Sequence, residues 1–254
     1  MKKNKLVKLR RELTINNIDG YIIPKNDEFF GEYVSPEKER LKYLTGFSGS
    51  AGQSLVLKKQ AFLFVDGRYT LQAQKEVRKG FKVIQIHKTI PSDILRKNKQ
   101  KLRIGFDPRI YSLASLINLY KTENVKLIPI KKNLIDKIWP NKPKLKFNKF
   151  FILKTQYAGK SFKNKINLIC KILKKKKIKN LLVTAPENVA WTLNIRGKDN
   201  SYSPIPNCNA IVNYKKKITL IVENKKISKN FESNFRKVVK YVNPTNITAH
   251  FNSL

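Results

Sequence analysis

The pattern of hydrophobic and polar positions predicts an α/β protein. Leu6, Leu9, Leu13 and Ile15 recur at helical spacing among lysines and arginines and predict an amphipathic helix. The apolar run "GYIIP" then predicts a buried strand that stops at Pro24. Two further apolar runs, "SLVL" and "AFLFVD", are separated by a short polar turn and predict a hairpin. The first half therefore begins as a helix followed by strands.

Alternating helix and strand patterns continue to residue 140. We expect helices in "RYTLQAQKEV", "PSDILRKNKQ", "SLASLINLYKTE" and "NLIDKIWP", and strands in "FKVIQIH", "KLRIGFD" and "VKLIPI". The polar, proline-containing segment 141–149 is typical of a linker. The sequence thus predicts a first domain over 1–140, a linker over 141–149 and a second domain over 150–254, each with a mixed sheet flanked by helices.

The second domain repeats the order of the first. A helix in "KSFKNKINLICKILKKKK" precedes a buried strand, "NLLVTAP", a helical stretch, "ENVAWTLNIRG", and a hairpin, "AIVNYKKKITLIVEN". The segments "YLTGF" and "WTLNIRG" occupy the same place in the two halves, and Asp66 and Glu223 close equivalent strands. Two copies of one α/β unit account for this order.

The second copy is predicted to be incomplete. After "RKVVKYVNP" and a short helix in "ITAHFNSL", the sequence has no counterpart of the last strands and helices of the first domain. A sheet without them is expected to leave an edge and an apolar face exposed.

The charge and composition narrow the possible functions. A net charge of +37 suggests nucleic-acid binding, but 44 of the 54 basic residues are lysine. Lysine lacks the planar guanidinium with which arginine makes paired hydrogen bonds to bases and phosphates. The run "KILKKKKIKN" keeps apolar residues at helical spacing, so its lysines form a solvated face. Nucleic-acid binding is therefore not favoured.

No apolar run is long enough to cross a membrane, and Cys170 and Cys208 are expected to be buried free thiols, so a cytoplasmic location is expected.

The nucleotide and serine-nucleophile motifs are incomplete. Gly46, Gly49 and Gly52 lack the close first pair of a dinucleotide loop, and we expect them to allow tight turning before the hairpin. In "LKTQYAGKS" the first glycine of a phosphate loop is missing, so Ser161 is expected to cap the next helix. Ser48 and Ser50 each match only half of G-x-S-x-G.

Metal chemistry has no support in the sequence. The 17 acidic residues are scattered, only two histidines (His87 and His250) are present, and four aspartates stand apart from other possible ligands: Asp66, Asp107, Asp136 and Asp199. We expect Asp66 to bond backbone amides at a strand end and Asp107 to begin a turn. No complete catalytic apparatus is predicted.

Several motifs together resemble those of a known family. The stretch from "GYIIPKNDEFF" through "YLTGFSGSAG" to "FLFVDGRYTLQA", with "LIPIKKNLIDKIW" and "ENVAWTLNIRGKDNSYSPIPNCNAIV", is similar to the N-terminal region of long-form Xaa-Pro aminopeptidases. The resemblance covers nearly the whole chain. It implies two creatinase N-terminal-type domains that precede a catalytic pita-bread domain, which this sequence lacks.

The resemblance also implies an activity. Enzymes of this family remove an N-terminal residue that precedes proline, with two divalent metal ions, usually manganese, held by the third domain. This chain would then be non-catalytic, with no metal ligands of its own. It would shape access to the cleft, with the catalytic domain, the proline-containing peptide and a homodimer as expected partners.

One site residue follows from the resemblance. The arginine of the DGRY motif is associated with bound peptide in this family, and it is Arg68 here. Its guanidinium could hydrogen-bond a peptide carbonyl or carboxylate. Without the resemblance, pairing of Arg68 with Asp66 or capping of a helix end would be favoured. The alternative function for the chain is a stand-alone or degenerate module that binds peptides or nucleic acid.

Overall fold

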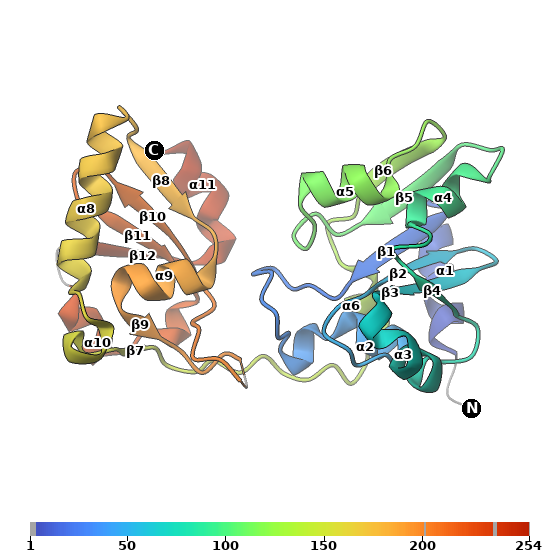
Figure 1. Cartoon of the computed structure of the whole chain (residues 1–254), viewed down its shortest axis with the longest axis horizontal. Coiled ribbons are helices and arrows are strands. Elements are labelled where there is room, and N and C mark those ends of the chain that lie inside the picture. The colour runs from blue at the N-terminus through green and yellow to red at the C-terminus, as the bar shows by residue number, and fades with distance from the viewer. Residues whose placement is uncertain (1–3, 201, 236–237, 254) are drawn as a thin grey trace. The chain divides into compact units, whose positions relative to one another are not determined.

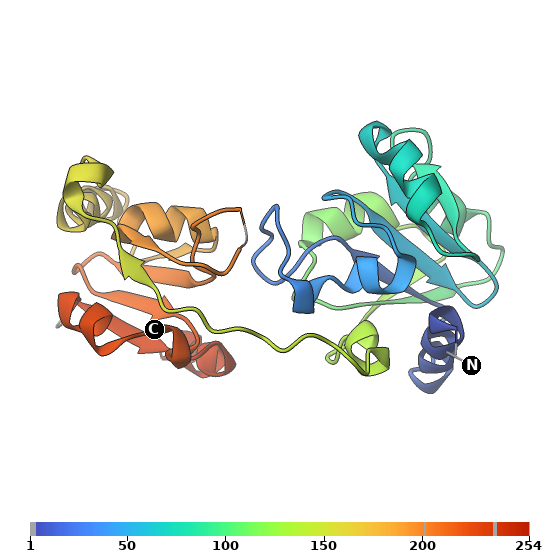
Figure 2. The same cartoon turned by 90° about the horizontal axis from the view of Figure 1, so that it is seen from below.

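The computed structural model describes residues 4–200, 202–235 and 238–253, and the chain divides into two compact units, Met1–Lys144 and Leu145–Leu254 (Figure 1). The boundary falls within segment 141–149, which has neither helix nor strand (Figure 2). Arg236 and Lys237, the first residues of "RKVVKYVNP", and Leu254 at the end of a predicted helix lie outside the described residues.

The first unit contains a six-stranded mixed sheet in the order β4-β3-β2-β1-β5-β6. Strands β1, β2 and β3 pair antiparallel, whereas β4, β5 and β6 each join the sheet in parallel. The strands are β1 (Gly20–Pro24), β2 (Gln53–Leu57), β3 (Ala61–Val65), β4 (Lys82–Gln85), β5 (Leu102–Phe106) and β6 (Val125–Pro129). The helices are α1 (Lys5–Ile15), α2 (Arg40–Thr45), α3 (Thr70–Glu76), α4 (Pro91–Arg96), α5 (Leu113–Tyr120) and α6 (Leu134–Ile138).

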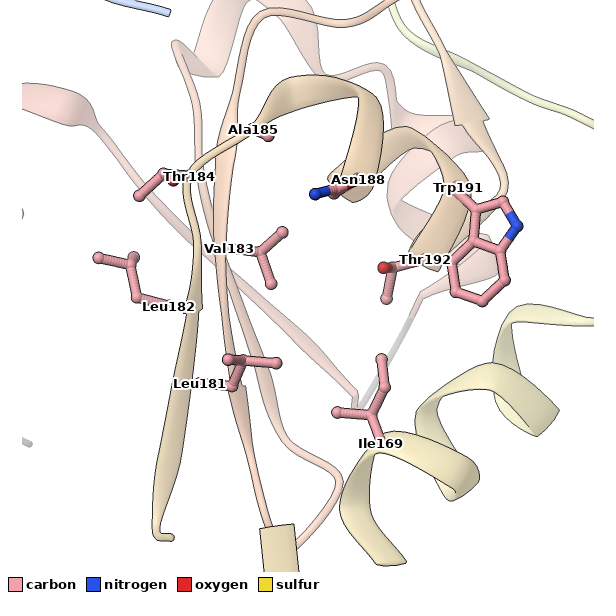
Figure 3. Close-up of a pocket in the computed structure, with 9 residues that line it drawn as sticks. All are labelled: Ile169, Leu181, Leu182, Val183, Thr184, Ala185, Asn188, Trp191 and Thr192. Carbon is pink, nitrogen blue, oxygen red and sulfur yellow. The ribbon is translucent and has the colours of Figure 1, made fainter. Parts of the chain in front are cut away.

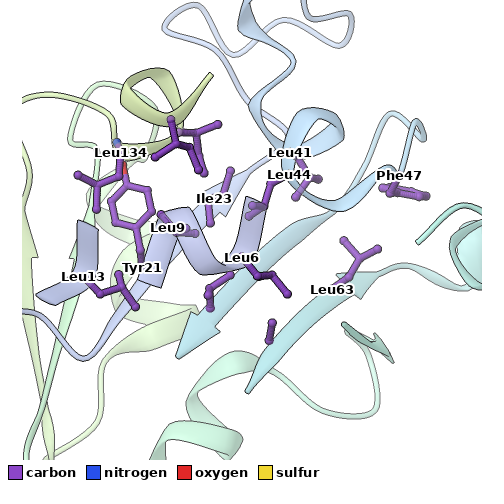
Figure 4. Close-up of a cluster of buried hydrophobic side chains, with 14 of the residues drawn as sticks. Leu6, Leu9, Leu13, Tyr21, Ile23, Leu41, Leu44, Phe47, Leu63 and Leu134 are labelled. Atoms are coloured by element: carbon purple, nitrogen blue, oxygen red, sulfur yellow. The ribbon is translucent and has the colours of Figure 1, made fainter. Parts of the chain in front are cut away.

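Helices cover both faces of this sheet because its strands are apolar on both sides. Alternate residues of β1 enter two different cores: Tyr21 and Ile23 pack with α1, α2 and α6 (Figure 4), whereas Ile22 packs with residues from α4 and α5. Both cores are fully buried at the centre of the sheet. The predicted helix, buried strand and hairpin at the start of the chain are confirmed.

The three glycines before the hairpin have the structural role expected of them. Gly46 ends α2 in the left-handed region with φ of 89°, where a side chain would be strained. A Cβ on Gly49 would lie 2.2 Å from Cζ of Phe47 and 2.8 Å from Cδ1 of Tyr69. The glycines therefore permit a tight turn and close packing, and they do not form a nucleotide loop.

The second unit contains a four-stranded sheet in the order β12-β11-β10-β8, and β7 pairs separately with β9. Its strands are β7 (Phe151–Ile152), β8 (Asn180–Val183), β9 (Ile195–Arg196), β10 (Asn209–Asn213), β11 (Ile218–Ile221) and β12 (Val239–Val242). Its helices are α7 (Thr155–Ala158), α8 (Phe162–Lys175), α9 (Pro186–Leu193), α10 (Lys229–Asn234) and α11 (Ile247–Asn252). The helices α8, α9 and α10 share one core with β10 and β11.

The two units are built alike, as the sequence repeat predicted. The order β12-β11-β10-β8 corresponds to β4-β3-β2-β1, with the same parallel and antiparallel pairings. A lysine in the helix that directly precedes β1 or β8 also has the same role in both: Lys5 Nζ of α1 donates to the carbonyl of Tyr43 at 2.6 Å, and Lys165 Nζ of α8 donates to that of Trp191 at 2.8 Å. In each unit the ammonium lies over the ring of the same aromatic residue. The repeat therefore extends to individual side chains.

Two expectations for the second unit were wrong. The strand predicted to be buried exposes Leu181 by 38% and Leu182 by 44%, because β8 is an edge strand among the described residues. The helix in "ENVAWTLNIRG" ends at Leu193, where Asn194 takes a left-handed conformation, and Ile195–Arg196 form β9. Four strands are described in this sheet, without counterparts of β5 and β6.

Candidate functional site

The DGRY motif lies directly after β3, at its carboxyl end. Asp66 is the N-cap of a short 3-10 helix, Gly67–Tyr69, and its Oδ1 accepts a hydrogen bond from the backbone N–H of Arg68 at 2.9 Å. The expectation that Asp66 bonds backbone amides at a strand end is confirmed. The cap fixes the direction in which the chain leaves the sheet, and with it the position of Arg68.

The side chain of Arg68 extends into solvent and folds back onto Asp66. It is 75% exposed; Nη2 lies 2.7 Å from Oδ2 of Asp66, and Nε lies 3.2 Å from Oδ1. The hydrogen bonds from Arg68 lower the pKa of Asp66, more than its slight burial raises it. Among the described residues, none accepts a hydrogen bond from Nη1. The guanidinium is thus oriented by Asp66 and retains N–H groups for a ligand.

The neighbouring loop supports this motif. Tyr69 packs edge-on against Phe47, with ring centroids 5.7 Å apart, and its hydroxyl lies 2.7 Å from Oγ of Ser50. Ser48 donates to the carboxylate of Glu76 at 2.7 Å. Both serines considered as nucleophiles are therefore engaged in structural hydrogen bonds. Neither of these bonds involves His87, an exposed residue in the turn after β4.

A hollow of about 340 Å³ lies beside Asp66. Its lining combines the carboxyl ends of β1 and β3 with the start of β2 and one side of α5, and includes Pro24, Asn26, Gln53, Val65, Asp66 and Ser115. Crevices at the carboxyl ends of strands are common ligand sites in sheets of this kind. The motif that carries Arg68 therefore borders a cavity of ligand-binding size.

A buried ionic network holds the loop after β1, and the sequence interpretation missed it. Arg40 is 2% exposed; its Nε and Nη2 each donate to Asp136 at 3.0 Å, and Nη2 also donates to Glu28 at 3.1 Å. Asp136 is on α6, so the network joins the loop to a distant helix. One signal was available: Arg40 precedes Leu44 by four positions and so shares its buried helix face.

The network sets the ionisation of its carboxylates. Burial alone would raise the pKa of Glu28, but Lys38 and Arg40 outweigh it and lower the pKa to about 2. Burial likewise opposes the effect of Arg40 at Asp136, whose pKa is nevertheless lowered. Both groups are therefore charged at neutral pH.

The other aspartates also have basic partners. Asp107 is fully buried; it accepts hydrogen bonds from Arg109 and Asn133, and its bond to the backbone of Arg109 confirms the predicted turn. Asp199 lies 2.8 Å from Nζ of Lys226, with both groups buried. These aspartates are isolated in the sequence but paired in the fold.

The remaining motifs of the second unit have structural roles. Ser161 Oγ accepts a hydrogen bond from the backbone of Asn164 at 3.2 Å and caps α8, as predicted. Cys170 and Cys208 are buried free thiols, also as predicted. The dense lysine run lies at the end of α8 and just beyond it, mostly exposed.

Neither a metal-binding cluster nor a membrane-spanning helix occurs in the part of the chain that the structure describes. In 4–200, 202–235 and 238–253, no three side chains of His, Cys, Asp or Glu come together in a group that could hold a metal ion. The donors present in these residues therefore do not fit a two-metal centre. No helix in this part of the chain combines the length and apolar character of a membrane span.

The fold and its two repeated units correspond to a known family. Residues 5–138 match the creatinase/prolidase N-terminal domain family, and residues 141–254 match a second family of the same description. The chain therefore belongs to the creatinase/prolidase N-terminal domain family.

The individual relatives are aminopeptidases. The probable Xaa-Pro aminopeptidase P of Laccaria bicolor is 32% identical over 98% of this chain and 40% of that protein, and that of Coprinopsis cinerea is 34% identical over 82% and 35%. Among solved structures, the X-prolyl aminopeptidase of Caenorhabditis elegans, described as a cytosolic enzyme with a di-nuclear active site, matches 98% of this chain and 44% of that chain. Its TM-score is 0.87 and its identity 26%. The chain spans about two fifths of the length of these relatives.

Proposed function

We propose that this chain is the N-terminal, non-catalytic part of a cytoplasmic Xaa-Pro aminopeptidase, a metal-dependent hydrolase that releases an N-terminal residue before proline. The observation that carries the proposal is the similarity of 98% of the chain, across both units, to the C. elegans X-prolyl aminopeptidase. The residues 1–140 and 150–254 are the two creatinase N-terminal-type domains, joined by the linker 141–149. The metal ions, two in number and usually manganese in this family, belong to a separate catalytic domain.

The role of the chain is to shape access to the catalytic cleft and to support assembly, including a homodimer. Arg68 is the residue through which it contacts peptide. Its exposure, its orientation by Asp66 and the N–H groups that remain available support this role. A guanidinium in this state can hydrogen-bond a carbonyl or carboxylate of the peptide with fixed geometry.

The first test is a cleavage assay of the 254-residue chain with an Xaa-Pro peptide and Mn²⁺. We expect no release of the N-terminal residue above the rate without protein, because the described donors do not form a metal centre. Manganese-dependent release that persists through purification and disappears with chelator would show that the chain is itself catalytic.

The second test addresses Arg68 in an active Xaa-Pro aminopeptidase that includes this chain. Loss of a charge-assisted hydrogen bond to the peptide should raise KM of Arg68→Ala by about tenfold or more. Arg96→Ala is the matched control, since Arg96 is also an exposed arginine paired with a nearby aspartate. A KM within twofold of the wild-type value would remove Arg68 from the peptide site.

A further inference from the structure

Hollows of similar size lie in the two units, but they differ in the polar groups that line them. The hollow of the second unit, about 360 Å³, lies against β8, α8 and α9, and its lining includes the exposed Leu181, Leu182 and Trp191 (Figure 3). As far as the chain is described, its lining has no buried side-chain nitrogen or oxygen that lacks a hydrogen bond. The hollow beside Asp66 does have unpaired polar groups in its wall, as a ligand site does.

Gln53 is a polar residue at the end of an apolar row. In β2 its side chain lies on the same face as Leu55 and Leu57, which pack in the core shared with α4 and α5. Pro24 and Phe64 lie directly opposite Gln53 on the two neighbouring strands, and all three residues line the hollow beside Asp66. The hollow therefore lies where this core ends, and the last position of the row is an amide.

The amide of Gln53 has a partner for its oxygen but not for its nitrogen. Oε1 accepts a hydrogen bond from the hydroxyl of Tyr120, a completely buried residue. This bond orients the amide, and among the described residues none accepts a hydrogen bond from Nε2. Gln53 is only 7% exposed and lines the hollow, so a partner for its NH₂ group would lie there.

Tyr111 provides a second unpaired group in the same wall. It precedes α5 and is 8% exposed, and its buried hydroxyl has no hydrogen-bond partner in the described part of the chain. Its ring packs edge-on against Tyr120, with ring centroids 6.0 Å apart. Buried polar groups are nearly always hydrogen-bonded, so two unpaired donors in one wall indicate a ligand that carries an acceptor atom.

The rest of the lining favours a neutral ligand. The large apolar side chains of the lining include Phe64, Val65, Ile86 and Leu119. Its two charged residues already have partners: the ammonium of Lys25 pairs with Glu39, and the carboxylate of Asp66 pairs with Arg68. A charged group of the ligand would therefore be buried without a partner, which is unfavourable. The hollow is suited to an apolar body that ends in a neutral oxygen, and among amino-acid side chains tyrosine combines the two.

From this lining we infer that the hollow beside Asp66 binds a tyrosine side chain, with the phenol oxygen as the missing acceptor for Gln53 and Tyr111. Asp66 joins the hollow to Arg68, because it lines the hollow and lies 2.7 Å from the guanidinium. A residue whose carbonyl or carboxylate binds Arg68 can therefore place its side chain in the hollow. That this residue belongs to the peptide, beyond the proline, rests on the proposed function.

The test is an NMR titration of the 254-residue chain with N-acetyltyrosine and with N-acetylphenylalanine. Both probes carry a carboxylate for Arg68, but only the first carries a phenol oxygen. We expect N-acetyltyrosine to shift the side-chain amide signal of Gln53 and to bind about threefold to tenfold more tightly than N-acetylphenylalanine. Gln53→Leu should abolish this preference and leave the binding of N-acetylphenylalanine unchanged.

Two variants of α5 test the hollow without altering Gln53. Ser115 lines the hollow, so Ser115→Trp would fill it and should abolish measurable binding of N-acetyltyrosine. Leu113→Trp is the matched control, because Leu113 lies on the same helix but is 73% exposed and is not part of the lining. It should bind N-acetyltyrosine like the wild type. Arg68→Ala should weaken both probes by a similar factor and keep the preference for tyrosine.

Other results overturn the inference. Equal affinities of the two probes, or no shift of the Gln53 amide, would show that this wall does not bind a phenol oxygen. Binding that survives Ser115→Trp would place the ligand elsewhere. If p-cresol binds as tightly as N-acetyltyrosine and Arg68→Ala has no effect, the hollow takes a free phenol and not a peptide side chain. The titration involves no hydrolysis, so it can fail while the cleavage and KM tests succeed, and the reverse.

Discussion

Replacement of Arg40 should show how much the buried ionic network contributes to the stability of the first unit. The variant Arg40→Met keeps most of the side-chain volume but removes the guanidinium, which leaves two carboxylates, Glu28 and Asp136, without their shared partner. Removing one partner of a buried pair costs about 3–5 kcal/mol. The carboxylate side chains are 20% and 25% exposed, so the lower end, about 3 kcal/mol, is expected. For a unit of this size the thermal midpoint should fall by roughly 10 °C.

The assay is urea unfolding followed through Trp139, which stacks on the same helix that carries Arg40. A Trp191→Phe background keeps the signal specific to the first unit. Arg96→Met is the matched control, because its pair with Asp93 is solvent-exposed and should contribute about 0.5 kcal/mol or less. A loss below about 1 kcal/mol for Arg40→Met would refute the view that this network stabilises the unit.

Acid should remove the difference in the free energy of unfolding between the wild type and Arg40→Met. The network lowers the pKa of Glu28 to about 2 in the folded state, below its value in the unfolded chain. A lowered folded-state pKa contributes stability above the unfolded pKa, and the contribution is lost as the pH falls through the folded value. The gap between wild type and Arg40→Met should therefore be constant near neutral pH and shrink between about pH 4.5 and 2. An unchanged gap at pH 2.5 would contradict this assignment.

A glycine substitution and a thiol reaction test the packing of buried residues. Gly49→Ala should destabilise the first unit by about 1–3 kcal/mol in urea unfolding, because the new Cβ would overlap the Phe47 ring. Gly31→Ala, whose Cβ would meet nothing closer than 3.6 Å, should change stability by less than about 1 kcal/mol, and equal effects would refute the steric argument. Cys170 and Cys208 should not react with a thiol reagent until the protein unfolds, since both are buried and burial raises the pKa of Cys208; rapid reaction of the native chain would contradict their burial.

Much of the fold could be predicted because its local signals agree. The hairpin of β2 and β3 has two apolar runs around a polar turn, and α1 has leucines at regular helical spacing. The spacing of apolar residues and the residues of the turn therefore predict the same helix and hairpin. The repeat was visible because both units use the same order of elements. Burial of β8 was misjudged for a physical reason: an apolar strand has the same sequence whether or not a neighbour covers it.

The candidate site could be predicted only in part. The DGRY motif stood out as a strand-end turn, and Asp66 caps it as expected. The network of Arg40, Glu28 and Asp136 could not be predicted, because Arg40 and Asp136 are 96 residues apart and only the fold brings them together. Pairings between distant charged residues depend on tertiary packing, and a single sequence gives few signs of them.

The shared lysine–aromatic contact of the two units makes each half an internal reference for the other. Lys5 with Tyr43, and Lys165 with Trp191, form one arrangement under two conditions: one aromatic ring is covered by Trp139, and the other is not. Lysine-to-methionine changes at the two positions would not differ by the cover alone, because Lys165 also donates to Oδ1 of Asn194 at 2.6 Å. A double-mutant cycle of Lys5→Met with Trp139→Ala isolates the thermodynamic coupling between the contact and its cover, and Lys165→Met gives the loss of the uncovered contact for comparison.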